Sequence, residues 1–284
     1  MSLKKKLAKL KEIISGYGSC VVAFSGGVDS TLLLKIASAV LPREKLLAVT
    51  ANSPTYPKEE LLFSKGMARR LGIRHKVIRT QELKDKRFIP NPPNRCYFCK
   101  YELFSRLKSI ATKHNLNFVA DASSVSDKLD FRPGSIAIRE LKIRSPLSEA
   151  GFTKGDIRSL SRSFGLETWD KPSLACLASR IPYGTRISLG LLNRIHKAEN
   201  YLRKNGFRQV RLRHYNGLCR IEVPESEIQR LINKRSRVTN RLKQLGYNFV
   251  TVDLEGYRTG SMNAALSRKK CNKLYKKGLG KRGD

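Results

Sequence analysis

The sequence predicts an α/β protein in which a doubly wound parallel sheet is followed by a smaller α+β domain. Between residues 3 and 120, short apolar runs of strand length alternate with segments of helical character. A glycine turn follows the first apolar run and leads directly into a helical segment, which is how a parallel sheet of this class begins. After residue 184 strands and helices no longer alternate regularly, which indicates a second domain of another kind.

Periodicity and the residues that interrupt it place the elements of the first domain. Residues 3–15 have the pattern of an amphipathic basic helix, and the apolar run 20–24 has the length of a strand. Pro54 and Pro57 follow the second strand, and a proline-rich loop at 90–93 leads into a later helix. Thr153 is a plausible N-cap for the last helix of this domain. The predicted strands are 20–24, 46–51, 75–79 and 118–120, and the further helices are 31–37, 58–71, 95–114 and 153–164.

The second domain is expected to begin after Gly184. A helix over 188–204 precedes strands over 209–213 and 218–223, a helical region over 225–245 and a last strand over 249–253. We therefore expect an α/β domain at 1–183 and an α+β domain, for substrate binding or oligomerisation, at 184–266. The remainder, 267–284, is a basic tail that we expect to be mobile.

The charge of the chain limits the classes of function. Lysine and arginine number 57 against 23 aspartate and glutamate residues, which gives a net charge of +34 over 284 residues. Such a field favours anionic partners, namely nucleic acid, nucleotides or phosphates. No apolar run approaches the roughly 18 residues of a membrane span, and the N-terminal sequence lacks the apolar core of a secretory signal. Six cysteines are too few for a disulfide framework. We expect a cytoplasmic protein that does not bind a membrane.

Residues 25–30, Ser-Gly-Gly-Val-Asp-Ser, form the strongest motif in the chain. Two glycines let the backbone turn tightly and approach an oxyanion without a clash from Cβ atoms. The helix that follows offers unbonded N–H groups and the positive end of its dipole, and the two serines add hydroxyl donors. The alternative is a glycine-rich turn without a ligand, which the strand before it and the helix after it make less attractive.

The motif resembles the pyrophosphatase loop (PP-loop) of the N-type ATP pyrophosphatases, the adenine nucleotide alpha hydrolase-like superfamily that includes GMP, NAD and asparagine synthetases and tRNA thiolases. The resemblance implies ATP as cofactor, cleavage between its α- and β-phosphates, and an adenylylated intermediate. It also implies that Asp29 lies near a Mg²⁺ ion, and that Thr50 and Ala51 contact adenosine. The implied nucleotide-binding residues are Ser25, Gly26, Gly27, Val28, Asp29, Ser30, Thr50, Ala51 and Asp121.

Further stretches in the same order resemble one branch, the ATP-dependent sulfur transferases of nickel-pincer cofactor synthesis (the LarE type). They are residues 94–100, 130–134 with 144–147, 168–172, 175–185 and 253–263, so they span nearly the whole chain. The branch implies that ATP adenylylates a carboxylate of a pyridinium dicarboxylate mononucleotide, and that a cysteine sulfur converts it to a thiocarboxylate. Cys176 matches the sulfur-bearing cysteine, Lys154 matches a phosphate-binding lysine, and Arg180 is a further candidate for catalysis. Taken alone, Cys176 would more often be a buried apolar cysteine.

Two sources of sulfur stay open. In the sacrificial form, the C–S bond of Cys176 breaks and leaves dehydroalanine. Alternatively, Cys96 and Cys99, together with Cys176, hold a [4Fe–4S] cluster, as in some relatives. A zinc half-site or an inert pair would also explain the first two cysteines.

Other residues have candidate roles in the second domain. Arg211 and Arg213 alternate on one strand and are candidates for the mononucleotide phosphate, because arginine makes bidentate phosphate contacts. Glu199 and Glu222 resemble acidic positions of a metal site, with ordinary surface carboxylates as the alternative. The branch departs from its usual pattern at Ser124 and Ser126, which replace an asparagine and an aspartate and put nucleotide handling in question.

Two rival functions remain at this point. The first is a tRNA thiolase or another ligase with the same fold, which would use RNA as a partner. It is motivated by five lysines in residues 1–11 and six basic residues in 203–220. The second is a catalytically silent RNA-binding protein. The resemblance also implies a homo-oligomer.

Overall fold

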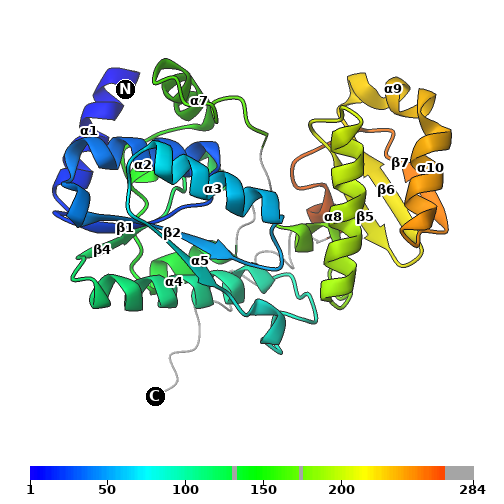
Figure 1. The fold of residues 1–284 in the computed structure, drawn as a ribbon, viewed down its shortest axis with the longest axis horizontal. Helices are drawn as coiled ribbons and strands as arrows, with labels where there is room; N and C mark the ends of the chain where they lie inside the picture. The colour runs from blue at the N-terminus through cyan, green and yellow to red at the C-terminus, as the bar shows by residue number, and fades with distance from the viewer. Residues whose placement is uncertain (130–132, 173–174, 266–284) are drawn as a thin grey trace. The chain divides into compact units, whose positions relative to one another are not determined.

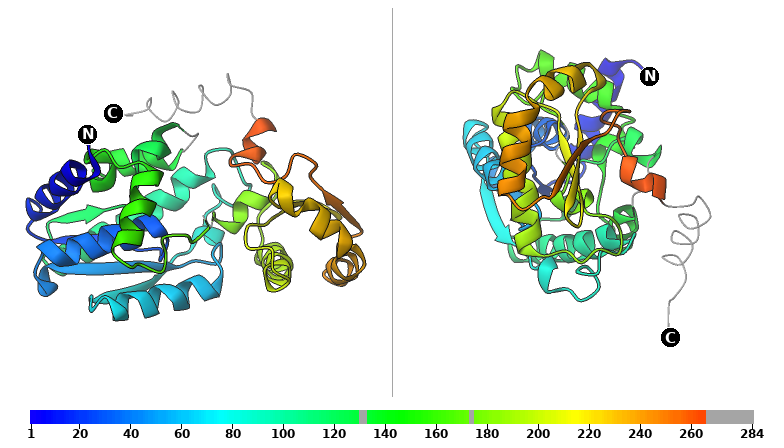
Figure 2. Two further views of the ribbon diagram at one scale, coloured as in Figure 1. Left: turned by 90° about the horizontal axis from the view of Figure 1, so that it is seen from above. Right: turned by 90° about the vertical axis from the view of Figure 1, so that its right-hand side faces the viewer.

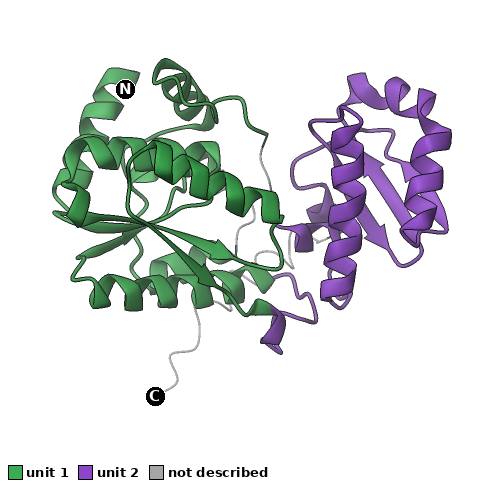
Figure 3. Ribbon diagram, viewed as in Figure 1, with its two compact units in different colours: residues 1–82, 94–173 green, residues 83–93, 174–284 purple. Residues whose placement is uncertain are grey.

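The computed structural model describes residues 1–129, 133–172 and 175–265 (Figure 1). The chain divides into two compact units (Figure 3). Unit 1 comprises residues 1–82 and 94–173, and unit 2 comprises 83–93 and the chain from 174 onward. The expected basic tail at 267–284 lies outside the described residues.

This division differs from the expected boundary after residue 183, because hydrogen bonds join segment 83–93 to the chain after 180. The side-chain amide of Asn91 donates to the carbonyl oxygens of Ile181, at 3.1 Å, and Pro182, at 2.7 Å. The N–H of Gly184 donates to the carbonyl oxygen of Asn91 at 3.0 Å. A loop from the middle of the α/β sequence therefore folds with the second unit.

Unit 1 is a four-stranded sheet in the order β3-β2-β1-β4, and all three strand pairs are parallel. After β3 the chain returns to the other side of β1 to form β4, so the sheet has a switch point between β1 and β4, where ligands of such folds bind. The strands are β1 (Cys20–Ala23), β2 (Leu46–Asn52), β3 (His75–Arg79) and β4 (Phe118–Ala120). The helices are α1 (Leu3–Ser15), α2 (Val28–Val40), α3 (Lys58–Arg70), α4 (Arg95–Lys113), α5 (Gly134–Glu140), α6 (Pro146–Glu149) and α7 (Lys154–Ser163).

Helices cover both faces of this sheet, which confirms the predicted doubly wound α/β fold. Side chains alternate along β1, so Cys20 and Val22 pack into one apolar cluster and Val21 into another. The first cluster includes residues of α1, α2 and α7, and the second includes Phe104 and Leu107 of α4. Figures 1 and 2 show α1, α2, α3 and α7 on one side of the sheet and α4 and α5 on the other.

Unit 2 is the predicted small α+β unit. Its sheet has the order β5-β6-β7, with β5 antiparallel to β6 and β6 parallel to β7. The strands are β5 (Arg211–Tyr215), β6 (Leu218–Glu222) and β7 (Phe249–Val252), and the helices are α8 (Leu189–Lys204), α9 (Ile228–Asn233) and α10 (Arg235–Gln244). Strand β5 begins two residues later than expected, and the predicted helical region 225–245 is two helices preceded by a 3₁₀ turn.

Candidate active site

The glycine loop connects β1 to α2 at the carboxyl edge of the sheet. Its two serines close the turn, since the Oγ atoms of Ser25 and Ser30 lie 3.0 Å apart and the N–H of Ser25 donates to Ser30 Oγ at 3.2 Å. Gly27 is the N-cap of α2 and has no side chain with which to cap it. The first-turn amides of Val28, Asp29 and Ser30 therefore begin a 13-residue helix whose N-terminus carries partial positive charge. This is the geometry of an anion site.

Gly26 is required at its position for two reasons. Its φ of +70° lies in the left-handed region that favours glycine. In addition, a Cβ atom there would lie 2.9 Å from Ser64 Oγ and 3.2 Å from Phe63 Cδ1 on α3. The loop thus packs directly against helix α3.

Asp29 and Lys154, which are 125 residues apart in sequence, meet beside this loop. The ammonium group of Lys154 lies 2.7 Å from Asp29 Oδ2 and 3.4 Å from Asp127 Oδ2. Helix α7 begins at Lys154, and a capping box between Thr153 and Asp156 fixes that beginning. The structure therefore brings two of the predicted site residues together and adds Asp127, which sequence reasoning did not select.

Ser124 and Ser126, the two departures from the expected pattern, have structural partners. The hydroxyl of Ser124 donates to Asp127 Oδ2 at 3.0 Å, and its N–H donates to the same atom at 2.8 Å. Ser126 Oγ accepts the N–H of Lys154 at 3.2 Å. Both serines thus support the residues around Lys154.

A pocket of about 130 Å³ adjoins the loop, between the ends of β1 and β2 and the start of α3. Thr50 and Ala51, the predicted adenosine contacts, are among its lining residues. The hydroxyl of Thr50 is already engaged, because it donates to the carbonyl oxygen of Phe24 at 2.7 Å and lies 2.8 Å from His75 Nε2. Ala51 and Ser25 also line this pocket, and Ser25 belongs to the glycine loop as well.

Asp121 follows β4 and organises the next loop. Its carboxylate accepts hydrogen bonds from the hydroxyls of Ser123, at 2.5 Å, and Ser145, at 2.6 Å. Lys100 of α4 lies 3.7 Å away. In the structure Asp121 is 5% exposed and serves this local network at the carboxyl edge of the sheet.

Residues near Asp29 fit a magnesium ion that arrives with ATP. Asp29 Oδ1 is buried and has no hydrogen-bond partner, and a carboxylate oxygen is the ligand that Mg²⁺ prefers. Among the residues that the structure describes, no group of three or more histidine, cysteine or acidic side chains is arranged to bind a metal ion. Magnesium in nucleotide sites commonly takes only one or two carboxylates and receives its other ligands from phosphates and water, so one aspartate is enough.

Of the three cysteines in the cluster hypothesis, Cys96 and Cys99 lie in unit 1 and Cys176 lies in unit 2. Cys96 is exposed in the first turn of α4, and Cys99 is half-buried one turn further along. Their spacing of three residues places both on one helix face. Cys176 belongs to unit 2 and precedes a 3₁₀ turn, Leu177–Arg180.

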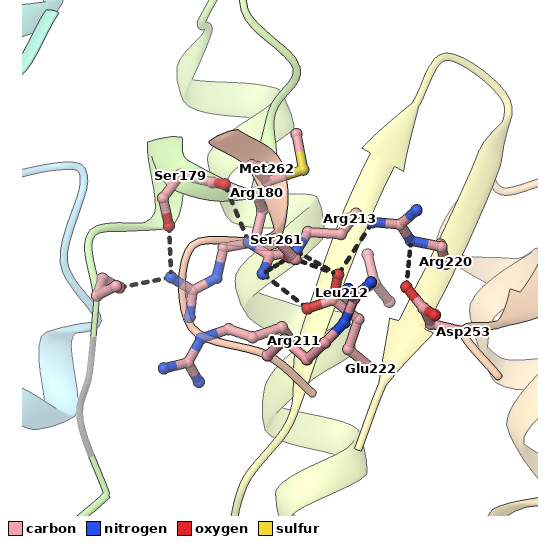
Figure 4. Close-up of polar contacts among 12 residues, drawn as sticks. Ser179, Arg180, Arg211, Leu212, Arg213, Arg220, Glu222, Asp253, Ser261 and Met262 are labelled. Atoms are coloured by element: carbon pink, nitrogen blue, oxygen red, sulfur yellow. Dashed lines mark hydrogen bonds and ion pairs between the residues drawn. The ribbon is translucent and has the colours of Figure 1, made fainter. Parts of the chain in front are cut away.

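In unit 2, Arg180 is fully buried and its guanidinium contacts the backbone at Cys176 (Figure 4). Its guanidinium donates to the carbonyl oxygens of Ala175, at 2.6 Å, and Cys176, at 3.1 Å. The other side of the group is paired with Glu199, at 2.8 Å and 3.1 Å. A planar fork of donors thus connects the segment of Cys176 to helix α8.

Glu199 and Glu222 are not surface carboxylates, as the alternative interpretation had it, because each is 0% exposed. Burial alone would raise the pKa of Glu199, but Arg180 and Arg203 keep it below its usual value. Glu222 accepts from Arg213 at 2.9 Å and 2.7 Å and from Arg220 at 3.0 Å. Both carboxylates are therefore engaged by guanidinium groups, which compete with a metal ion for them.

Arg211 and Arg213 lie on β5, as predicted, and both are buried. Figure 4 shows them beside Ser179, Arg180 and Glu222. Burial lowers the pKa of Arg211 to about 10, and the neighbouring Arg180 adds to this effect. The cluster contains five arginines and three carboxylates, so positive charge is in excess. Its members are Arg180, Arg203, Arg211, Arg213, Arg220, Glu199, Glu222 and Asp253.

The parallel sheet, the glycine loop at its switch point and the Asp29–Lys154 pair define a nucleotide-binding protein of the PP-loop class. A model of the asparagine synthase family matches residues 16–92. A pyridinium-3,5-bisthiocarboxylic acid mononucleotide synthase from Lactiplantibacillus plantarum is 38% identical over 94% of this chain and 97% of its own length. An uncharacterized protein from Synechocystis is 40% identical over 94% of this chain and 100% of its own length. An NH(3)-dependent NAD(+) synthetase from Chlorobaculum tepidum is 35% identical over 27% of this chain and 28% of its own length.

The chain therefore belongs to the family of the Lactiplantibacillus synthase, the LarE-type ATP-dependent sulfur transferases of the PP-loop superfamily. It is an enzyme that uses ATP, as the sequence predicted. In the part of the chain that the structure describes, no helix has the length and apolar character needed to cross a membrane.

Proposed function

We propose that the enzyme converts a carboxylate of a pyridinium dicarboxylate mononucleotide into a thiocarboxylate, for nickel-pincer cofactor synthesis in the cytoplasm. The printed activity of the Lactiplantibacillus relative supports this substrate class. The observation that carries the proposal is the contact of the buried Arg180 with the Cys176 carbonyl oxygen, which presents this cysteine from a fixed backbone.

Three steps account for the reaction. A carboxylate oxygen attacks the α-phosphorus of ATP, and pyrophosphate leaves with the electron pair of the broken P–O bond. The thiolate of Cys176 then attacks the acyl carbon of the adenylate, and AMP leaves. Finally, loss of the cysteine Cα proton with cleavage of its Cβ–S bond releases the thiocarboxylate and leaves dehydroalanine at position 176.

The residues of unit 1 serve the first step. The amides at the start of α2 and the hydroxyls of Ser25 and Ser30 bind the leaving pyrophosphate. Lys154, which is paired with Asp29, neutralises the negative charge of the leaving pyrophosphate. Asp29 would hold Mg²⁺, which supplies further neutralisation of the phosphate oxygens when bound.

The arginine cluster of unit 2 serves substrate binding. Its excess of positive charge supports a site for the mononucleotide phosphate at Arg211 and Arg213, because a buried cationic cluster attracts an anion that completes its charge balance. Arg180 would orient Cys176 during attack and is a positioning residue in that step.

The pair on α4 favours a second candidate for the sulfur source. Cys96 and Cys99, one turn apart, would hold a [4Fe–4S] cluster together with Cys176, and such a cluster supplies sulfide when bound. In this form the enzyme turns over repeatedly without loss of its own cysteine sulfur.

Intact-mass analysis separates the two sources. Purified protein is incubated with ATP, Mg²⁺ and the dicarboxylate mononucleotide, and pyrophosphate is measured along with polypeptide mass. Pyrophosphate release with loss of one H₂S at Cys176 supports the sacrificial step. Unchanged mass, an iron–sulfur absorbance and multiple turnover support the cluster, and full multiple turnover in Cys96→Ala contradicts it. Normal ATP binding without pyrophosphate release contradicts the proposed function.

Helix α10 supports a proposal that RNA is a further partner. It carries Arg235, Arg237, Arg241 and Lys243, all exposed, and no acidic residue. A helix whose charged residues are all cations suits a phosphate backbone.

A further inference from the structure

Lys171, which the proposed mechanism does not use, contacts the back of the phosphate loop. Its ammonium group donates to the carbonyl oxygen of Gly26 at 3.2 Å and to Glu60 Oε2 at 2.8 Å. It also stands over the ring of Phe63, 3.6 Å from the ring centroid. The side chain is 16% exposed. One lysine therefore joins the loop to helix α3.

The bond to Gly26 fixes a peptide group that glycine leaves unusually mobile. In a trans peptide, the carbonyl of Gly26 and the N–H of Gly27 point in opposite directions within one plane. Glycine on both sides permits that plane to rotate at small steric cost. When Lys171 binds the carbonyl oxygen, the direction of the Gly27 N–H follows, and this N–H lies 3.3 Å from Ser25 Oγ on the loop.

The backbone of Lys171 is itself anchored. Arg158 of α7 donates to the carbonyl oxygens of Trp169, at 2.7 Å, and Lys171, at 2.9 Å. The N–H of Lys171 donates to the carbonyl oxygen of Thr168 at 3.1 Å. The ammonium group is thus presented from a fixed turn.

We propose that Lys171 is a positioning residue for nucleotide binding, and that it sets the orientation of the Gly26–Gly27 peptide in the phosphate loop. Glu60 neutralises the charge of Lys171, so this lysine affects nucleotide binding by holding the loop in position. The phosphates are attracted instead by Lys154 and by the N-terminus of α2. Lys171 also lies five residues before Cys176 in the sequence. The inference rests on the proposed function only in taking ATP as the ligand.

Three variants test this role: Lys171→Met, Lys171→Arg and the control Arg230→Met. Arg230 lies in unit 2 and makes the same kinds of contact as Lys171: it pairs with Glu227 at 3.2 Å, donates to the carbonyl oxygen of Asn205 at 3.2 Å and lies over the ring of Phe207. Calorimetry measures Mg·ATP and inorganic pyrophosphate binding, and steady-state kinetics of pyrophosphate release provides KM and kcat. We expect Lys171→Met to weaken both ligands about tenfold, as the loss of a hydrogen bond from a charged donor does. KM for ATP should rise more than kcat falls.

The other variants make the result specific. Lys171→Arg should recover most of the affinity, because guanidinium also donates to a carbonyl oxygen, and Arg230→Met should bind both ligands as the wild type does. Wild-type affinity in Lys171→Met, or an equal loss in Arg230→Met, would overturn the inference. If the wild-type protein binds ATP but releases no pyrophosphate, the proposed function fails while the binding comparison still decides the role of Lys171. If the wild type binds neither ligand, both fail.

Discussion

Two glycines with the same backbone conformation show how differently single positions constrain the chain. Gly26 has a φ of +70° and Gly72 has a φ of +67°. A Cβ atom at Gly72 would meet nothing within 4 Å, whereas one at Gly26 would reach Ser64 and Phe63. A comparison of alanine variants at Gly26 and Gly72 therefore distinguishes the cost of backbone strain, which both share, from the cost of a steric clash, which only Gly26 has.

We expect Gly72→Ala to lower the free energy of unfolding by about 1–2 kcal/mol, the cost of a left-handed conformation with a Cβ atom. Gly26→Ala should cost more and should also abolish ATP binding, because the loop has to move off α3. Urea denaturation and calorimetry with Mg·ATP measure the two effects. Equal behaviour of the two variants would show that the contact with α3 is unimportant.

Glu199 is a residue whose ionisation should make folding pH-dependent. Its pKa is lowered in the folded state, since Arg180 and Arg203 outweigh burial. A lowered carboxyl pKa contributes stability that is present above the unfolded value of about 4.3 and is lost as pH falls through the lower folded value. We expect the free energy of unfolding to decline below about pH 4. Glu199→Gln should be less stable at neutral pH, because it leaves Arg180 without its counter-charge, and should show a flatter decline in acid. An equally steep acid decline in that variant would contradict the assignment.

At the scale of elements, helix α7 places Lys154 by means of its capping box. Thr153→Ala removes the cap, and we expect a loss of about 1 kcal/mol in unfolding free energy. ATP affinity should also fall, because Lys154 is the first residue of the helix. Ser188→Ala is the matched control, since Ser188 caps α8 in unit 2 through Leu191 N–H at 3.2 Å. It should cost similar stability and leave ATP affinity unchanged, and an ATP effect of equal size there would exclude the positional explanation.

The strands around the glycine loop were predictable because each is a local apolar run bounded by turn residues. Helices α5 and α6 were not predicted, since they have only seven and four residues and show no periodicity long enough to detect. Strand β5 was placed two residues early because polar and apolar residues already alternate over 209–213, whereas the strand itself spans Arg211–Tyr215. The loop 83–93 joined unit 2 through bonds of Asn91 to residues 90 positions away, which no local pattern reveals.

Similar limits apply to the site. Ser25 to Ser30 stand together in sequence and were recognised as a phosphate loop. Lys171 and Glu60 lie 111 residues apart, and only the fold brings them to Gly26. The lysine's place in the 168–172 stretch was the available indication of a role. Burial of Glu199 and Glu222 was missed because it depends on arginines of other elements, Arg180 for Glu199 and Arg213 for Glu222, which only the fold brings to them.

At the scale of the whole molecule, the net charge of +34 exceeds what one nucleotide and one mononucleotide require. Carboxylates neutralise much of the charge near the two sites, as Glu60, Asp127 and Glu222 do. On α10 the cations are exposed and the helix has no acidic residue of its own. Part of the excess charge is therefore exposed on α10.

We expect this surface to bind single-stranded RNA in a salt-dependent manner. Each neutralised phosphate releases counterions, which makes the fall of log affinity with log salt concentration steeper by about 0.7. The double variant Arg237→Gln/Arg241→Gln should reduce that slope by about 1.4 and weaken binding to RNAs of unrelated sequence equally. Arg70→Gln is a suitable control, because Arg70 is exposed but already paired with Glu167, and both residues belong to unit 1 whereas α10 belongs to unit 2. Fluorescence anisotropy across a range of KCl concentrations measures the slopes. An unchanged slope in the double variant would remove α10 as the binding surface, and an absence of wild-type binding at low salt would exclude RNA as the partner of the excess charge.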